Sequence, residues 1–128
     1  MLSFTDEMHS TTNYSRLDYN REKTAKSFKS LVDRNQFIYI TDECLMLGTA
    51  DETFFGDSVI ANDCLIYVKK DYRGKGHSAL AINQFVKWAE EIGVDSIMIG
   101  QSSGVSNQEF ASVAKSCGFK KQGEVFAR

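Results

Sequence analysis

The sequence predicts an α/β protein, of the mixed α+β kind, with a mixed central sheet flanked by helices. Three observations support this class. A β-rich segment at residues 64–69 runs through a glycine-bearing turn into a strongly amphipathic helix at residues 78–92. A short apolar run, residues 96–100, follows as a buried strand. A second helix and a final short strand complete an alternating order that is typical of helices packed on a sheet.

The N-terminal half is predicted to contain one helix and one hairpin. Asn20 is a favourable N-cap for a helix from Arg21 to Arg34. The inward positions of this helix are predicted to be Ala25, Phe28, Leu31 and Val32. Residues 36–41 and 44–49 are predicted to form a hairpin around Asp42-Glu43, although these are not the preferred residues of tight hairpin turns.

The C-terminal half is predicted to contain two helices and two short strands. The helix at 78–92 is expected to bury one apolar stripe and to stop at Gly93. The centre of that stripe is Ala81, Phe85, Ala89 and Ile92, widened by Leu80, Ile82 and Trp88. Ser106 and Glu109 form a capping box for the second helix, whose apolar face is Phe110, Val113, Ala114 and Cys117. A last strand is expected from Glu124 to Ala127.

The turn at residues 73–78 is the most informative segment of the chain. Gly74 and Gly76 have no Cβ, so a phosphate can approach the backbone closely. A glycine turn that opens a helix directs several N–H groups at one point, with the positive end of the helix dipole behind them. Arg73 and Lys75 add two cations. The segment therefore predicts a phosphate or pyrophosphate site, and the alternative is a basic surface turn that caps a helix.

The spacing of the loop residues excludes two common kinds of nucleotide-binding loop and matches a third phosphate-binding pattern. The nucleotide P-loop pattern is absent, and so is the dinucleotide fingerprint, because Ala79 stands where its third glycine is required. The pattern R-x-x-G-x-[GA] does fit Arg73 and Gly76, with Ser78 as the small last residue. With its lead-in from Val68, this loop resembles the pyrophosphate loop of the GNAT superfamily of acetyl-CoA-dependent N-acetyltransferases.

A second part of the chain carries the same resemblance. Gly118-Phe119 and Asn107, which is eleven residues ahead of Gly118, stand where the closing motif of that family has them. Element order extends the resemblance over the whole chain, as a single GNAT-like domain at 1–128. The specific residues lie mainly in 68–78 and 107–119. The opening residues 8–14 resemble small phage and bacterial GNAT-like proteins that lack the usual first strand.

The resemblance implies a GNAT fold in which two splayed parallel strands form the cofactor cleft and the first strand is missing or short. It implies acetyl-CoA as the cosubstrate. The pantetheine arm would lie along the strand that ends at Val68, the pyrophosphate would bind the loop, and Asn107 would reach the cofactor arm. The expected cofactor-binding residues are Tyr67, Val68, Arg73, Gly74, Lys75, Gly76, His77, Ser78 and Asn107.

Catalysis, as the resemblance implies, is direct attack of an amine on the acetyl thioester. Three carboxylates that lie before or at the start of the cofactor strand are candidates for the base: Glu52, Asp57 and Asp63. Each of them also fits a solvated loop carboxylate with no role in catalysis. The family usually has a tyrosine four residues before the Gly-Phe pair, where this chain has Ala114. Cys117 or a water is a candidate for the missing acid, although Cys117 also fits a buried small hydrophobe.

Composition sets the remaining expectations. The chain has 128 residues and a net charge of −2, which gives no general attraction to nucleic acid. No apolar run reaches the roughly 18 residues of a membrane span. Three widely spaced cysteines predict reduced thiols in the cytoplasm, or in the host cytoplasm if a phage encodes the protein. Two histidines without clustered ligands predict no metal site. We expect a monomer or homodimer.

Three functions are consistent with these observations. The first is an acetyltransferase that acts on a small-molecule or peptide amine of unknown identity. The second is a GNAT-fold module that binds CoA or nothing and acts as a structural or interaction protein, which the Ala114 position favours. The third is a binder of nucleic acid or another anionic partner through Lys69, Lys70, Arg73 and Lys75, which the net acidity disfavours.

Overall fold

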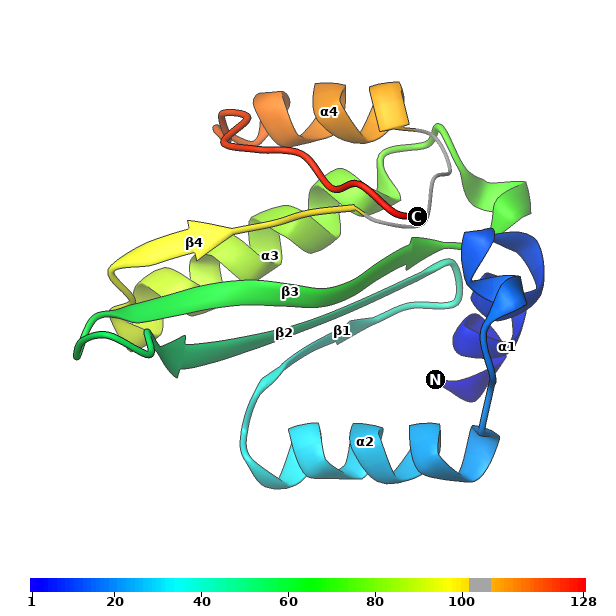
Figure 1. Ribbon diagram of the computed structural model, residues 1–128. Coiled ribbons are helices and arrows are strands. Elements are labelled where there is room, and N and C mark those ends of the chain that lie inside the picture. Colours follow the sequence, from blue (N-terminus) through cyan, green and yellow to red (C-terminus); the bar gives the residue numbers. More distant parts are fainter. Residues whose placement is uncertain (102–106) are drawn as a thin grey trace.

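In the computed structural model, a four-stranded sheet lies between two layers of helices (Figure 1). The structure describes residues 1–101 and 107–128. The strands are β1 (Phe37–Ile40), β2 (Cys44–Glu52), β3 (Val59–Val68) and β4 (Ser96–Met98), and they adjoin in the order β1-β2-β3-β4. The first three are antiparallel, and β4 runs parallel to β3. The sheet is therefore mixed, and the predicted hairpin of β1 and β2 is confirmed.

Local capping residues place the start of α2 and the end of α3. The helices are α1 (Leu2–Thr11), α2 (Arg21–Asp33), α3 (His77–Ile92) and α4 (Asn107–Ser116), with the short 3₁₀ turns η1 (Asn13–Arg16) and η2 (Lys70–Tyr72). The Asn20 side chain accepts a hydrogen bond from the N–H of Lys23 at 2.9 Å, which confirms the predicted N-cap. Gly93 ends α3 with a φ of 77°, as predicted. Helix α1 was not predicted.

Two hydrophobic clusters form the core, one on each face of the sheet. Alternation along β2 sends Leu45 and Leu47 toward α1 and α2, and it sends Cys44 and Met46 toward α3. The α3 side is completed by Phe37, Ala61, Ala81, Ile82, Phe85 and Ala89. The opposite side is completed by Phe4, Phe28, Leu31 and Tyr67. Helices α1 and α2 therefore cover one face and α3 covers the other, with α4 beside α3 (Figure 1).

Some of the predicted core positions are exposed in the structure. Phe28 and Leu31 of α2 are buried, whereas Ala25 and Val32 are exposed and line an open pocket beside the start of α1. Ile92 belongs to the last turn of α3 and is exposed, since it lies beyond the central part of the helix that packs on the sheet.

The predicted last strand at 124–127 does not form. A strand requires a hydrogen-bonded neighbour, and within the part of the chain that the structure describes no strand pairs with this segment. Val125 and Phe126 are exposed, and Lys121 forms a surface ion pair with Glu124 at 2.7 Å. The strand predicted at 96–100 is shorter than expected and ends at Met98.

Gly48 provides a test of the packing between β2 and α3. A Cβ at this position would clash with Cε1 of Phe85 and lie 3.0 Å from its Cδ1. Phe85 is fully buried, so its ring has no open space to move into. We expect Gly48→Ala to lower the free energy of unfolding by about 1–3 kcal/mol, measured by urea unfolding. An unchanged midpoint would contradict this packing.

Candidate functional site

Strands β3 and β4 separate after a short parallel pairing. They pair only at Ile60 with Ser96, Ala61 with Ile97 and Asn62 with Met98. Strand β3 then continues to Val68 with β2 on its other side. Among the described residues, no strand pairs with this side of β3 beyond Asn62. The structure thus contains the splayed parallel strands that the resemblance implied, with an open backbone edge on β3.

A β-bulge lies where the two strands separate. Leu47 pairs with Leu65 and Gly48 pairs with Asp63, so Cys64 is an extra residue in β3. Such bulges bend a strand and increase its local twist. One residue earlier, Oδ1 of Asp63 accepts a hydrogen bond from the N–H of Gly100 at 2.9 Å. The Asp63 carboxylate therefore links β3 to the segment that follows β4.

The carboxyl group of Asp63 has a raised pKa. Burial raises the pKa of its carboxyl from 3.8 to about 6, and the hydrogen bond from Gly100 opposes that rise. At pH 7 the carboxylate is therefore ionised but close to its pKa, which suits a general base. Burial also raises the pKa of the neighbouring Cys64 thiol. Asp63 is thus partly buried and more basic than an ordinary aspartate. It lies at the point where β3 and β4 separate.

The loop before α3 offers unpaired N–H groups. Gly74 and Gly76 have φ values of 76° and 84°, which only glycine adopts readily, and no heavy atom lies within 4 Å of a Cβ built at either. No described group accepts a hydrogen bond from the N–H groups of residues 76–79, and Leu80 is the first to bond, to the Gly76 carbonyl at 3.2 Å. At the positive end of α3, four consecutive donors thus have no acceptor among the described residues.

The two loop cations lie differently. The Arg73 side chain folds back, because its Nε donates to the Val68 carbonyl at 3.1 Å and its guanidinium lies 5.3 Å from the centre of the Tyr67 ring. Lys75 extends over the exposed Tyr72 ring, 5.8 Å from its centre. The Arg73 side chain is thus held against the end of β3 by these contacts. Lys75 is the loop cation whose side chain remains on the surface.

Tyr67 faces away from the open edge of β3. Its side chain is 5% exposed and packs under α1. Its hydroxyl donates to Oε2 of Glu7 at 2.7 Å and lies 3.0 Å from Oγ1 of Thr11. The same Glu7 oxygen accepts from the N–H of Lys70 at 3.2 Å. Glu7 thereby ties α1 to the start of the loop, and Tyr67 can meet a ligand only through its backbone.

Removal of the Tyr67 hydroxyl tests this link. Tyr67→Phe keeps the ring in the core but leaves Glu7 without its shortest partner. We expect the free energy of unfolding to fall by about 1–3 kcal/mol, because a hydrogen bond to a charged group is lost. Urea unfolding measures the change, and Tyr72→Phe, at an exposed tyrosine outside both core clusters, is the control. Equal midpoints for wild type and Tyr67→Phe would show that the Glu7 contact contributes nothing.

Several of the other predicted site residues lie in or beside α4, but Asp57 does not. Asn107 is the first residue of α4, and Ser106 of the expected capping box lies outside the described residues. Ala114 is half-buried in α4. Cys117 is half-buried against α3, with its Sγ 4.0 Å from the Ala79 carbonyl. Asp57 lies in the exposed turn between β2 and β3, at the far end of β3 from the loop.

Sequence patterns did not reveal Glu7 or Gly100. Their partners are 60 and 37 residues away in the chain, so no local motif joins them. The back-folded position of Arg73 was also not foreseen, since the motif specifies an arginine but not its partner.

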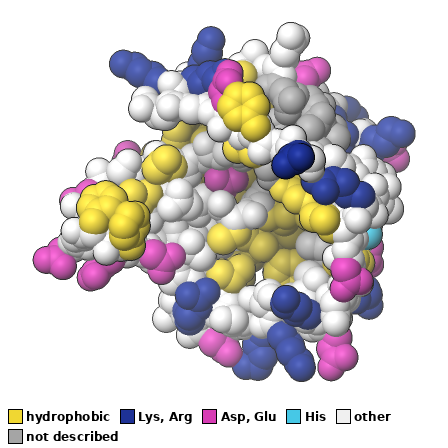
Figure 2. Space-filling view, viewed as in Figure 1, with side chains coloured by type: hydrophobic (Ala, Val, Ile, Leu, Met, Phe, Trp, Pro, Cys, Tyr) yellow, Lys and Arg dark blue, Asp and Glu magenta, His cyan; other side chains and the backbone are white. Residues whose placement is uncertain are grey.

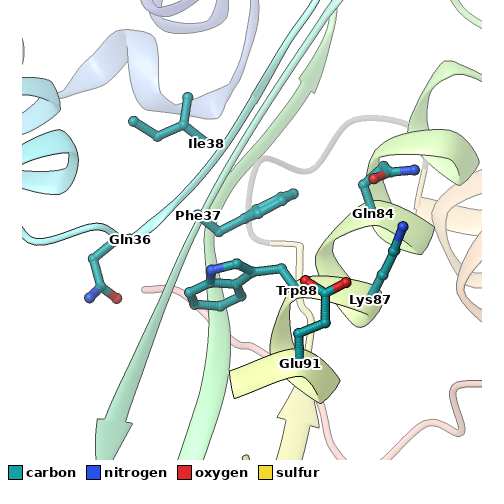
Figure 3. A pocket seen from close by; sticks show the side chains of 7 residues that line it. All are labelled: Gln36, Phe37, Ile38, Gln84, Lys87, Trp88 and Glu91. Atoms are coloured by element: carbon teal, nitrogen blue, oxygen red, sulfur yellow. The ribbon is translucent and has the colours of Figure 1, made fainter. Parts of the chain in front are cut away.

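A separate pocket lies at the opposite edge of the sheet. Its volume is about 320 Å³, and Figure 3 shows the Phe37 and Trp88 rings between β1 and α3. Gln36, Ile38, Gln84, Lys87 and Glu91 complete its lining. Because β1 and β4 are the two outer strands, this pocket is not part of the site formed by β3 and α3.

In the described ranges, no helix is both long and apolar enough to cross a bilayer. Across the same ranges, no three His, Cys, Asp or Glu residues gather closely enough to hold a metal ion.

Comparison with protein families gives one match. The model of the acetyltransferase (GNAT) family matches residues 6–119. No curated protein sequence matches the chain.

Several solved structures share the fold. Aminoglycoside 6'-N-acetyltransferase AAC(6')-IG from Acinetobacter haemolyticus has a TM-score of 0.65 at 15% identity, over 98% of this chain and 90% of its own. AAC(6')-Iy in complex with the bisubstrate analogue CoA-S-monomethyl-acetylneamine has a TM-score of 0.68 at 16% identity, over 99% and 90%. Glucosamine-6-phosphate N-acetyltransferase from Arabidopsis thaliana has a TM-score of 0.67 at 11% identity, over 100% and 92%. At these identities the likeness concerns the fold.

Proposed function

Because this chain belongs to the acetyltransferase (GNAT) family, whose model matches residues 6–119, we propose that it transfers the acetyl group of acetyl-CoA to an amine. One observation carries the proposal. The N–H groups of residues 76–79, which have no acceptor among the described residues, lie where α3 begins, next to the end of the open edge of β3. One continuous surface thus offers donors for a diphosphate and a strand edge for an extended amide-bearing chain.

The residues present fit two parts of CoA, the diphosphate and the pantetheine arm. The diphosphate accepts from the N–H groups of residues 76–79, with Lys75 and the Ser78 side chain beside it and Gly74 leaving room for it. The pantetheine arm lies along the backbone of residues 63–68. His77 and Asn107 are further proposed contacts. One helix terminus stabilises an exposed charge by about 0.3–1 kcal/mol, whereas micromolar binding requires about 8 kcal/mol. The β3 edge must therefore contribute most of the affinity.

Asp63 is the proposed base. In the reaction, the amine nitrogen forms a bond to the acetyl carbon, the carbon–sulfur bond breaks, and the CoA thiolate leaves. The amine must lose a proton, and a carboxylate with a pKa of about 6 accepts it, directly or through one water. Asp63 lies at the point where β3 and β4 separate, which is where the thioester arrives if the arm follows β3.

Protonation of the departing thiolate is assigned to water. Ala114 has no acidic hydrogen at the position where the family usually has tyrosine. The thiol of Cys117 is oriented toward the Ala79 carbonyl at 4.0 Å and packs against α3, so it is the weaker candidate. Loss of a general acid slows such a reaction by about 10²–10⁴-fold without preventing it.

Ala114 also supports a second function, a CoA-binding module without transfer activity. Both functions predict that acetyl-CoA raises the melting temperature, because a ligand of the folded state stabilises it. Only the transferase releases the CoA thiol when an amine is added. The three free cysteines favour action in the reducing cytoplasm for either function.

A thiol-release assay with an amine panel tests the proposal. Aminoglycosides and amino sugar phosphates come first, because solved structures of similar fold are named for them, followed by polyamines and N-terminal peptides. We expect amine-dependent thiol release that Asp63→Asn suppresses. Thermal stabilisation by acetyl-CoA without release across the panel would instead support the non-catalytic module, and no stabilisation at millimolar acetyl-CoA would contradict both.

A further inference from the structure

The turn between β2 and β3 exposes two adjacent phenylalanines. Phe54 is 99% exposed and Phe55 is 78% exposed, and their rings meet edge to face with centroids 5.0 Å apart. In Figure 2 this turn forms a hydrophobic patch at the left end of the molecule. Single exposed apolar residues are ordinary, but two neighbouring aromatic rings at the tip of a projecting turn are typical of interaction sites.

Hydrogen bonds fix the shape of this turn. The Thr53 N–H donates to the Ser58 carbonyl at 2.9 Å, and the Thr53 hydroxyl donates to the Gly56 carbonyl at 3.4 Å. At its base, the Val59 N–H donates to Oδ2 of Asp95 at 2.8 Å, and the Asp95 N–H donates to the Val59 carbonyl at 2.9 Å. The rings are therefore presented on an ordered support, which reduces the entropy lost on binding.

Carboxylates surround the two rings. Asp51, Glu52 and Asp57 are exposed, and in the described ranges none of them forms an ion pair. Figure 2 shows acidic side chains around the patch. The tip, residues 51–57, is thus both aromatic and negatively charged.

We propose that the tip docks a basic segment of a protein partner, through lysine or arginine side chains. Such cations stack on aromatic faces and pair with carboxylates, so one arginine-bearing segment satisfies both features of the tip. The same carboxylates repel nucleic acid and anionic membrane surfaces. They also repel a second copy of the tip. This docking is independent of acetyl transfer, because the tip lies at the opposite end of β3 from the loop that opens α3.

A peptide titration tests the docking. The probe is a fluorescein-labelled 12-residue peptide of alternating arginine and leucine, and fluorescence anisotropy measures its binding to the full chain. The variants are F54S/F55S, which removes the rings, and D51N/E52Q/D57N, which removes the charges. The control is V125S/F126S, because these residues are also exposed and apolar but lie in the segment after α4, away from the tip in the sequence. Circular dichroism verifies that each variant folds.

We expect wild type and V125S/F126S to bind the peptide equally, and each tip variant to bind at least about tenfold more weakly. Acetyl-CoA should stabilise all four proteins alike. Absence of binding, or equal binding by the tip variants, would overturn the proposal. It would also fail if sedimentation showed a wild-type dimer that F54S/F55S abolishes, or if anionic phosphatidylserine vesicles bound the tip in place of the peptide.

Discussion

Gly76→Val should abolish the stabilisation of this protein by CoA. The N–H of residue 76 is the first of the four donors that have no acceptor among the described residues, and a valine side chain there would occupy space that glycine leaves empty beside them. At 100 times its Kd, CoA should stabilise the wild type by about 2.7 kcal/mol, which is a rise of several degrees in Tm. Thermal unfolding with and without CoA measures this rise, and we expect none for Gly76→Val.

The variant needs a control because valine is strained in the left-handed region. Gly76 has a φ of 84°, so its replacement costs about 1–2 kcal/mol even without a ligand. Gly93 provides a matched position, since its φ is 77° and a Cβ there would meet no heavy atom within 4 Å. It caps the other end of α3. Gly93→Val should lose similar stability and keep the full response to CoA. A preserved response in Gly76→Val would show that the diphosphate does not bind at this loop.

Asp63→Asn should lower the rate of acetyl transfer by about 10²–10⁴-fold. In the wild type the rate should rise with pH through about 6, because the ionised carboxylate is the active form. The variant should lack this dependence. Asp42→Asn, in the exposed turn between β1 and β2, is the control and should keep both rate and pH profile. Initial rates between pH 5 and 8 measure the effect, and an unchanged profile in Asp63→Asn would exclude Asp63 as the base.

The same variant should be more stable than the wild type at pH 7. The folded protein holds the Asp63 proton more tightly than the unfolded chain, because burial raises the pKa from 3.8 to about 6. Protonation therefore favours folding, and this contribution is lost as the pH rises from about 4 to 6. The difference corresponds to at most about 3 kcal/mol. An asparagine can still accept the Gly100 N–H bond without the buried charge. Lower activity with higher stability would separate a catalytic role from a structural one.

Local patterns predicted much of the fold. Asn20 and Gly93 placed the ends of two helices, and apolar periodicity identified α3 and the β1–β2 hairpin. The strand predicted at 124–127 failed because apolar alternation does not supply a hydrogen-bonded neighbour. A pattern of residue types indicates which face of an element can be buried, but the partner depends on tertiary structure.

In the candidate site, too, some features follow from local sequence patterns and others depend on tertiary structure. The two loop glycines were predictable, because a close approach of phosphate requires residues without Cβ. The bond from Gly100 to Asp63 was not predictable, because it joins backbone to side chain across 37 residues. Nor could the sequence show that Tyr67 turns toward Glu7 rather than the cleft, since that depends on the register of β3 beside α1.

The most direct measurement is a ¹⁵N-resolved NMR titration of the protein with CoA. If the diphosphate is bound by backbone donors at the start of α3, the amide resonances of residues 76–79 should shift most, together with those along 63–68. Resonances of the β2–β3 turn should not move. Saturable shifts confined to other parts of the chain, with residues 76–79 unchanged, would contradict the account.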